Sequence, residues 1–92
     1  MTNAIVLLKV SKECINEVAE TIVNLDGVSE VYSVAGQYDL AAVIRASGDS
    51  QVASLVTEQS LKAKGILSSE TRIAVRTFSR YDLERMFAIG MD

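Results

Sequence analysis

The pattern that most constrains the fold is a strand, an amphipathic helix and a second strand, and it occurs twice. Each helix ends near a glycine that a branched apolar residue follows, at Gly27-Val28 and Gly65-Ile66. Two such units in the order βαββαβ build a ferredoxin-like sandwich. We therefore predict an α+β protein with a four-stranded antiparallel sheet and two helices on one of its faces.

Periodicity assigns the elements to residues. Apolar runs predict strands at 4–10, 28–35, 38–46 and from 66 to about 78. Apolar residues three and four apart predict one helix between Ser11, its expected cap, and Gly27, and a second at 51–64. In the second strand, alternation predicts one face with Val28, Glu30, Tyr32 and Val34.

Two of the predicted strands carry apolar side chains on both faces, so the face without helices is also apolar. Hydrophobic residues make up 49% of the 92 residues, which is more than so small a domain can bury alone. We expect two copies to pair through their sheets. The domain is predicted to cover 1–78. The tail at 79–92, with Leu83, Met86 and Phe87 at helical spacing, is predicted to form a short amphipathic turn that either packs against a neighbouring subunit or frays.

Composition argues against several functions. The chain has no histidine and one cysteine, Cys14, which we expect to be half-buried near a helix start. Without histidine the commonest general base and metal ligand are missing, so we expect no enzyme, no metal and no cofactor. The net charge of −3 and the scattered basic residues argue against direct nucleic-acid binding. Arg72 and Arg76 are expected to be surface arginines on one strand face. The sequence has neither the pattern of a signal peptide nor that of a membrane span, which favours a soluble cytoplasmic protein.

The segment from Val34 to Leu40 is the best candidate for a binding site. Only Gly36 and Gln37 separate two predicted strands, which is typical of a tight hairpin turn. Gly36 can adopt a positive φ at little cost, and Asp39 lies where a strand begins, a place that disfavours a carboxylate. The turn could hold a small polar ligand. Alternatively, Gly36 makes the turn and Asp39 binds nearby backbone N–H groups.

Together these motifs resemble the effector-binding (RAM) domain of the Lrp/AsnC, or feast/famine, transcription regulators. Gly27-Val28 followed by Val34-Ala35-Gly36-Gln37-Tyr38-Asp39 is similar to that family's Gly-Val, strand, Thr-Gly-x-Tyr-Asp pattern. Gly65-Ile66 followed by Ser69-Glu70-Thr71-Arg72-Ile73 resembles its Gly-Val-x-x-Thr-x-Thr-x-Ile pattern. The resemblance extends to about Phe78. Ala35 and Ser69 stand where the family commonly has threonine.

This resemblance implies a sensor of a small molecule, usually an amino acid, without a DNA-binding segment of its own. It implies dimers paired through their sheets, rings of dimers, and an effector near the contacts between dimers. Asp39 would bind the ligand's ammonium, and backbone N–H groups near Gly36 its carboxylate. The expected ligand-binding residues are Ala35, Gly36, Gln37, Tyr38, Asp39, Ser69 and Thr71.

Two other functions fit the same pattern. Enzymes of the dimeric α/β-barrel kind also pair two ferredoxin-like sheets, although many of them use histidine. The chain could instead be an assembly partner that joins full-length regulators into mixed oligomers and binds no effector. Titration with amino acids separates this last function from that of a sensor.

Overall fold

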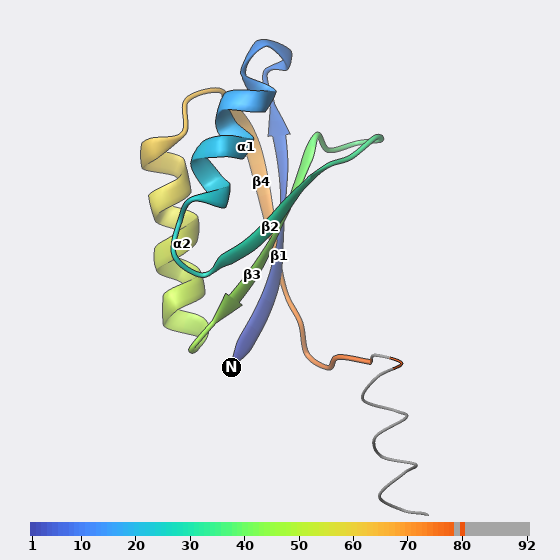
Figure 1. Cartoon of the computed structure of the whole chain (residues 1–92), viewed down its shortest axis with the longest axis vertical. Coiled ribbons are helices and arrows are strands. Elements are labelled where there is room, and N and C mark those ends of the chain that lie inside the picture. Colours follow the sequence, from blue (N-terminus) through green and yellow to red (C-terminus); the bar gives the residue numbers. More distant parts are fainter. Residues whose placement is uncertain (79, 81–92) are drawn as a thin grey trace, which may run out of the picture.

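The structure, a computed structural model, describes residues 1–78 and 80. It has the predicted order of elements: β1 (Thr2–Val10), a 3-10 turn η1 (Lys12–Cys14), α1 (Ile15–Val23), β2 (Val28–Ser33), β3 (Leu40–Ala46), α2 (Asp49–Lys62) and β4 (Ile66–Ile73). The sheet is antiparallel throughout, with the strand order β2-β3-β1-β4 (Figure 1). The predicted ferredoxin-like sandwich is confirmed. The helical turn expected at Leu83, Met86 and Phe87 lies outside the described residues.

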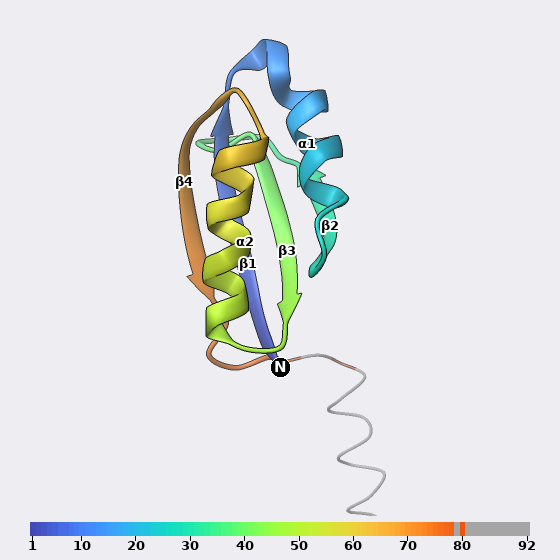
Figure 2. The same ribbon diagram turned by 90° about the vertical axis from the view of Figure 1, so that its left-hand side faces the viewer.

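Both helices cover the same face of the sheet, and the core lies between the two layers (Figure 2). The two central strands turn alternate side chains toward it. The buried strand residues are Ala4, Val6, Leu8 and Val10 on β1, and Leu40, Ala42, Ile44 and Ala46 on β3. Val18 and Ile22 of α1 and Val52 and Leu55 of α2 are buried against them. Each helix therefore presents one apolar stripe to the sheet.

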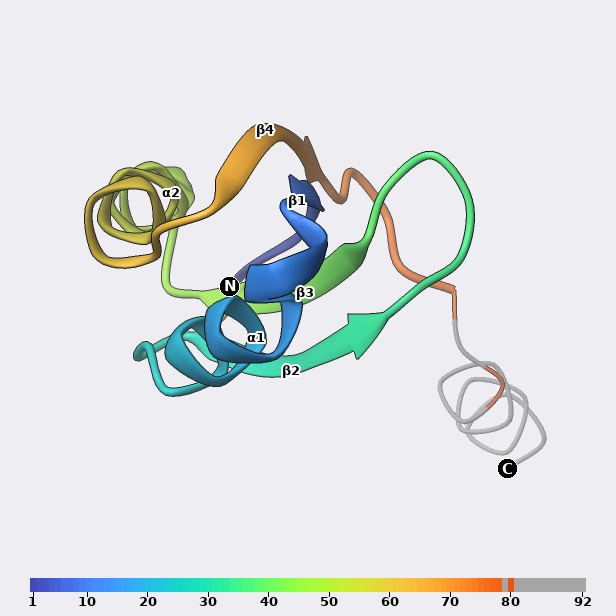
Figure 3. The ribbon, with the colours of Figure 1, turned by 90° about the horizontal axis from the view of Figure 1, so that it is seen from above.

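No described residue forms a layer over the opposite face, which we call the bare face (Figure 3). Its apolar side chains come from the alternate positions of β1 and β3, namely Ile5, Leu7, Ala41 and Val43. Ile5 is 45% exposed and Tyr32, on the neighbouring β2, is 51% exposed. The predicted apolar character of this face is confirmed, whereas pairing through it stays a prediction.

The β2 face assignment was wrong because β2 contains a bulge. The register with β3 shifts between Val28, which pairs with Ile44, and Glu30, which pairs with Val43. An extra residue in one strand reverses the alternation of the side chains that follow it. Val28 therefore lies on the helix side of the sheet, while Glu30 and Tyr32 lie on the bare face.

Several element boundaries also differ from the predictions. Ser11 makes no side-chain cap hydrogen bond, and η1 separates it from α1. Helix α1 ends at Val23, so Gly27 (φ +96°) belongs to the turn in which the Val28 N–H donates to the Leu25 carbonyl at 3.1 Å. Cys14 is half-buried and free, as expected.

Strand β4 is shorter than predicted and ends at Ile73 instead of Phe78. Arg76 therefore lies beyond the strand and does not share a strand face with Arg72. Its guanidinium lies 5.8 Å from the centre of the Phe78 ring, a cation–π distance. Both arginines are exposed, as the sequence predicted.

Candidate functional site

The predicted two-residue turn is a longer loop. β2 ends at Ser33 and β3 begins at Leu40, so residues 34–39 connect them. The Val34 N–H donates to the Asp39 carbonyl at 3.0 Å and closes the base of this loop. Gly36 has φ +121°, the positive value that its type allows. Ala35, Gly36 and Gln37 are exposed, and the loop projects from the sheet on the side away from the helices (Figure 1).

Asp39 ties this loop to the end of β1. Its Oδ2 accepts a hydrogen bond from the Val10 N–H at 2.8 Å. Its own N–H donates to the Leu8 carbonyl at 2.8 Å. One Asp39 oxygen, Oδ2, therefore binds a backbone N–H, as the alternative interpretation of the sequence expected. That N–H belongs to β1, far away in the sequence, and not to the turn itself. Oδ1 accepts no hydrogen bond within the described residues.

Tyr38 ties the loop to the far side of β1. Its hydroxyl donates to Glu70 Oε2 on β4 at 2.6 Å, and the Arg72 guanidinium lies 3.0 Å from Glu70 Oε1. The hydrogen bond with Glu70 raises the pKa of Tyr38 above its usual value. The same hydrogen bond, with the positive charge of Arg72 adding to it, lowers the pKa of Glu70. Because β1 lies between β3 and β4, this contact holds the loop across the end of the sheet.

The other two predicted residues, Ser69 and Thr71, share a strand face, as expected, but they lie on the opposite side of the sheet from Glu70. They pair with Leu8 and Val6 of β1, whose side chains are in the core. Both hydroxyl-bearing side chains are nevertheless exposed. The structure therefore brings Tyr38 and Asp39 to one end of the sheet but does not gather all seven predicted residues around one point.

Sequence reasoning missed Glu70 and Arg72 as parts of this site. They alternate with Ser69 and Thr71 along β4, so the period of two along a strand assigned them to the opposite face. Only the pairing of Leu7 with Glu70 and of Ile5 with Arg72 shows that this is the bare face.

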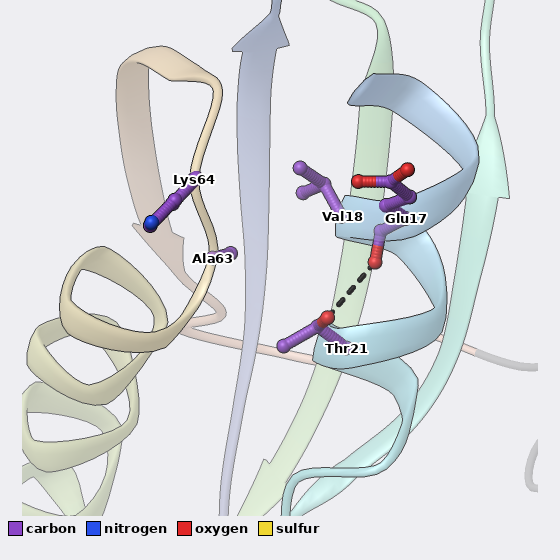
Figure 4. Close-up of a pocket in the computed structure, with 5 residues that line it drawn as sticks. All are labelled: Glu17, Val18, Thr21, Ala63 and Lys64. Carbon is purple, nitrogen blue, oxygen red and sulfur yellow. Dashed lines mark hydrogen bonds between the residues drawn. The ribbon is translucent and has the colours of Figure 1, made fainter. Parts of the chain in front are cut away.

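Two clefts occur elsewhere on the molecule. A cleft of about 210 Å³ lies between α1 and the residues after α2, lined by Glu17, Val18, Thr21, Ala63 and Lys64 (Figure 4). A shallower cleft of about 420 Å³ lies along α2 and is lined by Ala53, Ser54, Thr57 and Glu58. Neither is lined by a predicted site residue.

Among the described residues, no group of three or more histidine, cysteine or carboxylate side chains is placed to hold a metal ion. The described helices are also too short or too polar to cross a membrane.

The hydrogen bond between Tyr38 and Glu70 predicts a pH effect. Because the pKa of Glu70 is lowered, the stabilisation it provides is present above the usual carboxylate pKa and is lost as pH falls through the lowered one. Tyr38→Phe removes the main cause, so the Glu70 pKa should rise toward its usual value. Carboxyl-carbon NMR titration measures this shift. Tyr32→Phe is the matched control and should leave the Glu70 pKa unchanged; equal values in wild type and Tyr38→Phe would contradict the contact.

Known protein sequences resemble most of this chain. The sequence model of the Lrp/AsnC ligand binding domain matches residues 3–83. An uncharacterized HTH-type transcriptional regulator of Pyrococcus furiosus is 36% identical over 61 residues, which are 66% of this chain and 41% of that protein. The uncharacterized HTH-type regulator YugG of Bacillus subtilis is 33% identical over 77 residues, 84% of this chain and 45% of that protein. The chain thus spans less than half the length of these relatives.

Solved structures show the same fold. A Thermus thermophilus protein, TTHA0845, has a TM-score of 0.80 and 35% identity, covering 87% of this chain and 100% of the other. Escherichia coli AsnC has a TM-score of 0.78 and 17% identity over 86% of this chain and 54% of its own. A transcriptional regulator of Neisseria meningitidis, solved as a complex with L-Met, has a TM-score of 0.75 and 11% identity over 86% of this chain and 53% of its own.

Proposed function

Because the chain belongs to the Lrp/AsnC ligand binding domain family, we propose that it is a regulatory module that binds an amino acid and assembles into dimers and larger rings. The relatives are named as transcriptional regulators, so its partners in this proposal include full-length regulators of the same family. The observation that carries the proposal is the loop at residues 34–39, which Tyr38 and Asp39 fix at one end of the sheet.

An amino acid suits the groups that this loop presents. In the proposal Asp39 binds the ammonium through Oδ1, since Oδ2 accepts the Val10 N–H. Backbone N–H groups near Gly36 and Gln37 bind the carboxylate. A Cβ at Gly36 would meet no atom within 4 Å, so the loop is open for a ligand to approach. The Neisseria relative was solved with an amino acid, L-Met, which supports this ligand class.

The remaining predicted residues have different roles in this proposal. Ala35 and Tyr38 flank Gly36 and Gln37 in the loop. Ser69 and Thr71 lie on the helix side of β4, so they would contact a ligand held by a neighbouring copy in a ring. This arrangement agrees with an effector bound where dimers meet.

Isothermal titration with each of the common amino acids tests effector binding. We expect saturable heat with one or a few of them, and a weaker response from Asp39→Asn. A folded, assembled protein that gives no heat with any amino acid would contradict the sensor and favour the assembly partner.

Assembly through the bare face can be tested separately. Ile5→Lys places a charge on the bare face, so sedimentation should show a shift to monomers while circular dichroism stays native. Val23→Lys is the matched control, because Val23 is also apolar and is 41% exposed, but it lies on α1, which covers the other face of the sheet. Unchanged assembly in Ile5→Lys would remove the bare face from the interface.

A further inference from the structure

One unpaired positive charge lies beside the candidate site. Lys9 is an exposed residue near the end of β1, between the buried Leu8 and Val10. Alternation along β1 places its side chain on the bare face, and Ser68 of β4 is its neighbour across the sheet. Within the described residues, the Lys9 ammonium takes part in no ion pair and no hydrogen bond. It is therefore available to an anion from outside the chain.

The hydrogen bond between Asp39 and Val10 places Lys9 close to the Asp39 carboxylate. Asp39 Oδ2 lies 2.8 Å from the Val10 nitrogen, and one peptide bond joins that nitrogen to Lys9. By standard bond lengths, Oδ2 is thus within about 6 Å of the Lys9 Cα. The four-carbon stem of lysine is flexible, so the ammonium can reach a group that is bound beside Oδ1. Figure 1 shows the same proximity, since the loop at residues 34–39 lies beside the end of β1.

The other charges near this end of the sheet are matched within the chain. Glu70 of β4 accepts the Tyr38 hydroxyl and an Arg72 N–H, so neither Glu70 nor Arg72 lacks an opposite charge. Lys9 is the remaining cation of β1 and β4. It lies next to Asp39 Oδ1, which also accepts no hydrogen bond within the described residues. An ammonium and a carboxylate oxygen that no internal contact uses are therefore close together.

An α-amino acid carries its ammonium and its carboxylate on one carbon atom, so a site for it needs an anion and a cation close together. In the proposed function, Asp39 binds the ammonium, but only uncharged backbone N–H groups bind the carboxylate. A lysine ammonium forms a charge-assisted hydrogen bond with a carboxylate, which is stronger than a bond from a neutral donor. Lys9 can add this positive charge to the backbone donors.

We propose that Lys9 binds the α-carboxylate of the amino acid whose ammonium Asp39 binds. Lys9 is then the residue that makes the site specific for a free carboxylate, and it selects amino acids over their amides and over simple amines. This inference rests on the proposed amino-acid sensor and adds the charged group that recognises the carboxylate.

Comparison of each amino acid with its α-carboxamide tests this role, because the amide keeps the ammonium and loses the negative charge. The probes are the common L-amino acids and their α-carboxamides, titrated by calorimetry at about pH 6.5, where the α-ammonium stays charged. We expect wild type to bind its best amino acid roughly tenfold to hundredfold more tightly than the matching amide. Lys9→Met should weaken binding of the amino acid by about the same factor. It should leave binding of the amide unchanged, since the amide has no charge for Lys9 to bind.

Two further variants complete the comparison. Lys9→Arg keeps the positive charge and should retain most of the preference for the amino acid. Lys12→Met is the matched control, because it removes another exposed lysine, which lies in η1 and not on the sheet. It should bind the amino acid and the amide as wild type does. Since Lys9 is exposed, the melting temperature of Lys9→Met should stay close to that of wild type.

Three results would overturn the inference, and they differ from one another. If Lys9→Met keeps the wild-type preference for the amino acid over the amide, Lys9 does not bind the carboxylate, while the sensor stands. If Lys9→Met loses affinity for the amino acid and the amide equally, Lys9 only supports the shape of the loop. If wild type gives no heat with any amino acid, the proposed sensor itself is wrong, and the role of Lys9 falls with it.

Discussion

Gly65→Ala should lower the free energy of unfolding by about 2–5 kcal/mol, the largest effect that we expect from a single methyl group. A Cβ at Gly65 would lie 2.6 Å from the Cβ and 2.9 Å from the Sγ of Cys14. Gly65 also has φ +102°, which side-chain-bearing residues rarely adopt. The Gly65 carbonyl accepts the Ser11 N–H at 2.8 Å, so this turn cannot move away without breaking the link to the start of η1.

Gly36→Ala separates backbone strain from steric overlap. Gly36 has φ +121°, but a Cβ there would meet no atom within 4 Å. Its cost should be the strain alone, about 1–3 kcal/mol. Urea unfolding of both variants at one protein concentration measures the difference, since assembly also contributes to stability. If the free energy of unfolding of Gly65→Ala is no lower than that of Gly36→Ala, the Cys14 side chain can move at little cost to make room for the added methyl group.

The fold was predictable because its strongest signals are local. Each of these signals lies within a few consecutive residues and identifies one element. They are the branched apolar runs, the helical spacing and the two Gly-apolar pairs. Two strands were expected to carry apolar side chains on both faces, and in the structure Val6 and Leu8 lie on the helix side while Ile5 and Leu7 lie on the bare face. The bulge after Val28 was not predictable in the same way, since either register of β2 places apolar residues on both faces.

The site was predictable in its segments but not in its contacts. Residue types pointed to Gly36 and Asp39, and the resemblance added Ser69 and Thr71. The Tyr38 contact with Glu70 depends on β1 lying between β3 and β4, which only the sheet order reveals. The bond from the Val10 N–H to Asp39 joins residues 29 apart in sequence, and no local pattern encodes it.

Asp39→Ala and Asp39→Asn together should separate the two roles of this carboxylate. Asp39→Ala removes the acceptor of the Val10 N–H and should cost about 1–3 kcal/mol of stability, since a backbone donor loses its partner. Asp39→Asn keeps an oxygen at the same place and removes the charge, so its melting temperature should stay close to that of wild type.

The affinity for the amino acid should fall in both variants. A hydrogen bond between charged groups contributes about 1.5–3 kcal/mol, which corresponds to roughly a tenfold to hundredfold change in affinity. Calorimetry with the effector identified for the wild type, together with ligand-free melting curves, provides the paired data. If Asp39→Asn melts like wild type, weaker binding by this variant cannot be attributed to lost structure. If Asp39→Asn binds as tightly as wild type while Asp39→Ala melts much earlier, Asp39 serves only to fasten the loop to β1, and the ammonium must bind elsewhere.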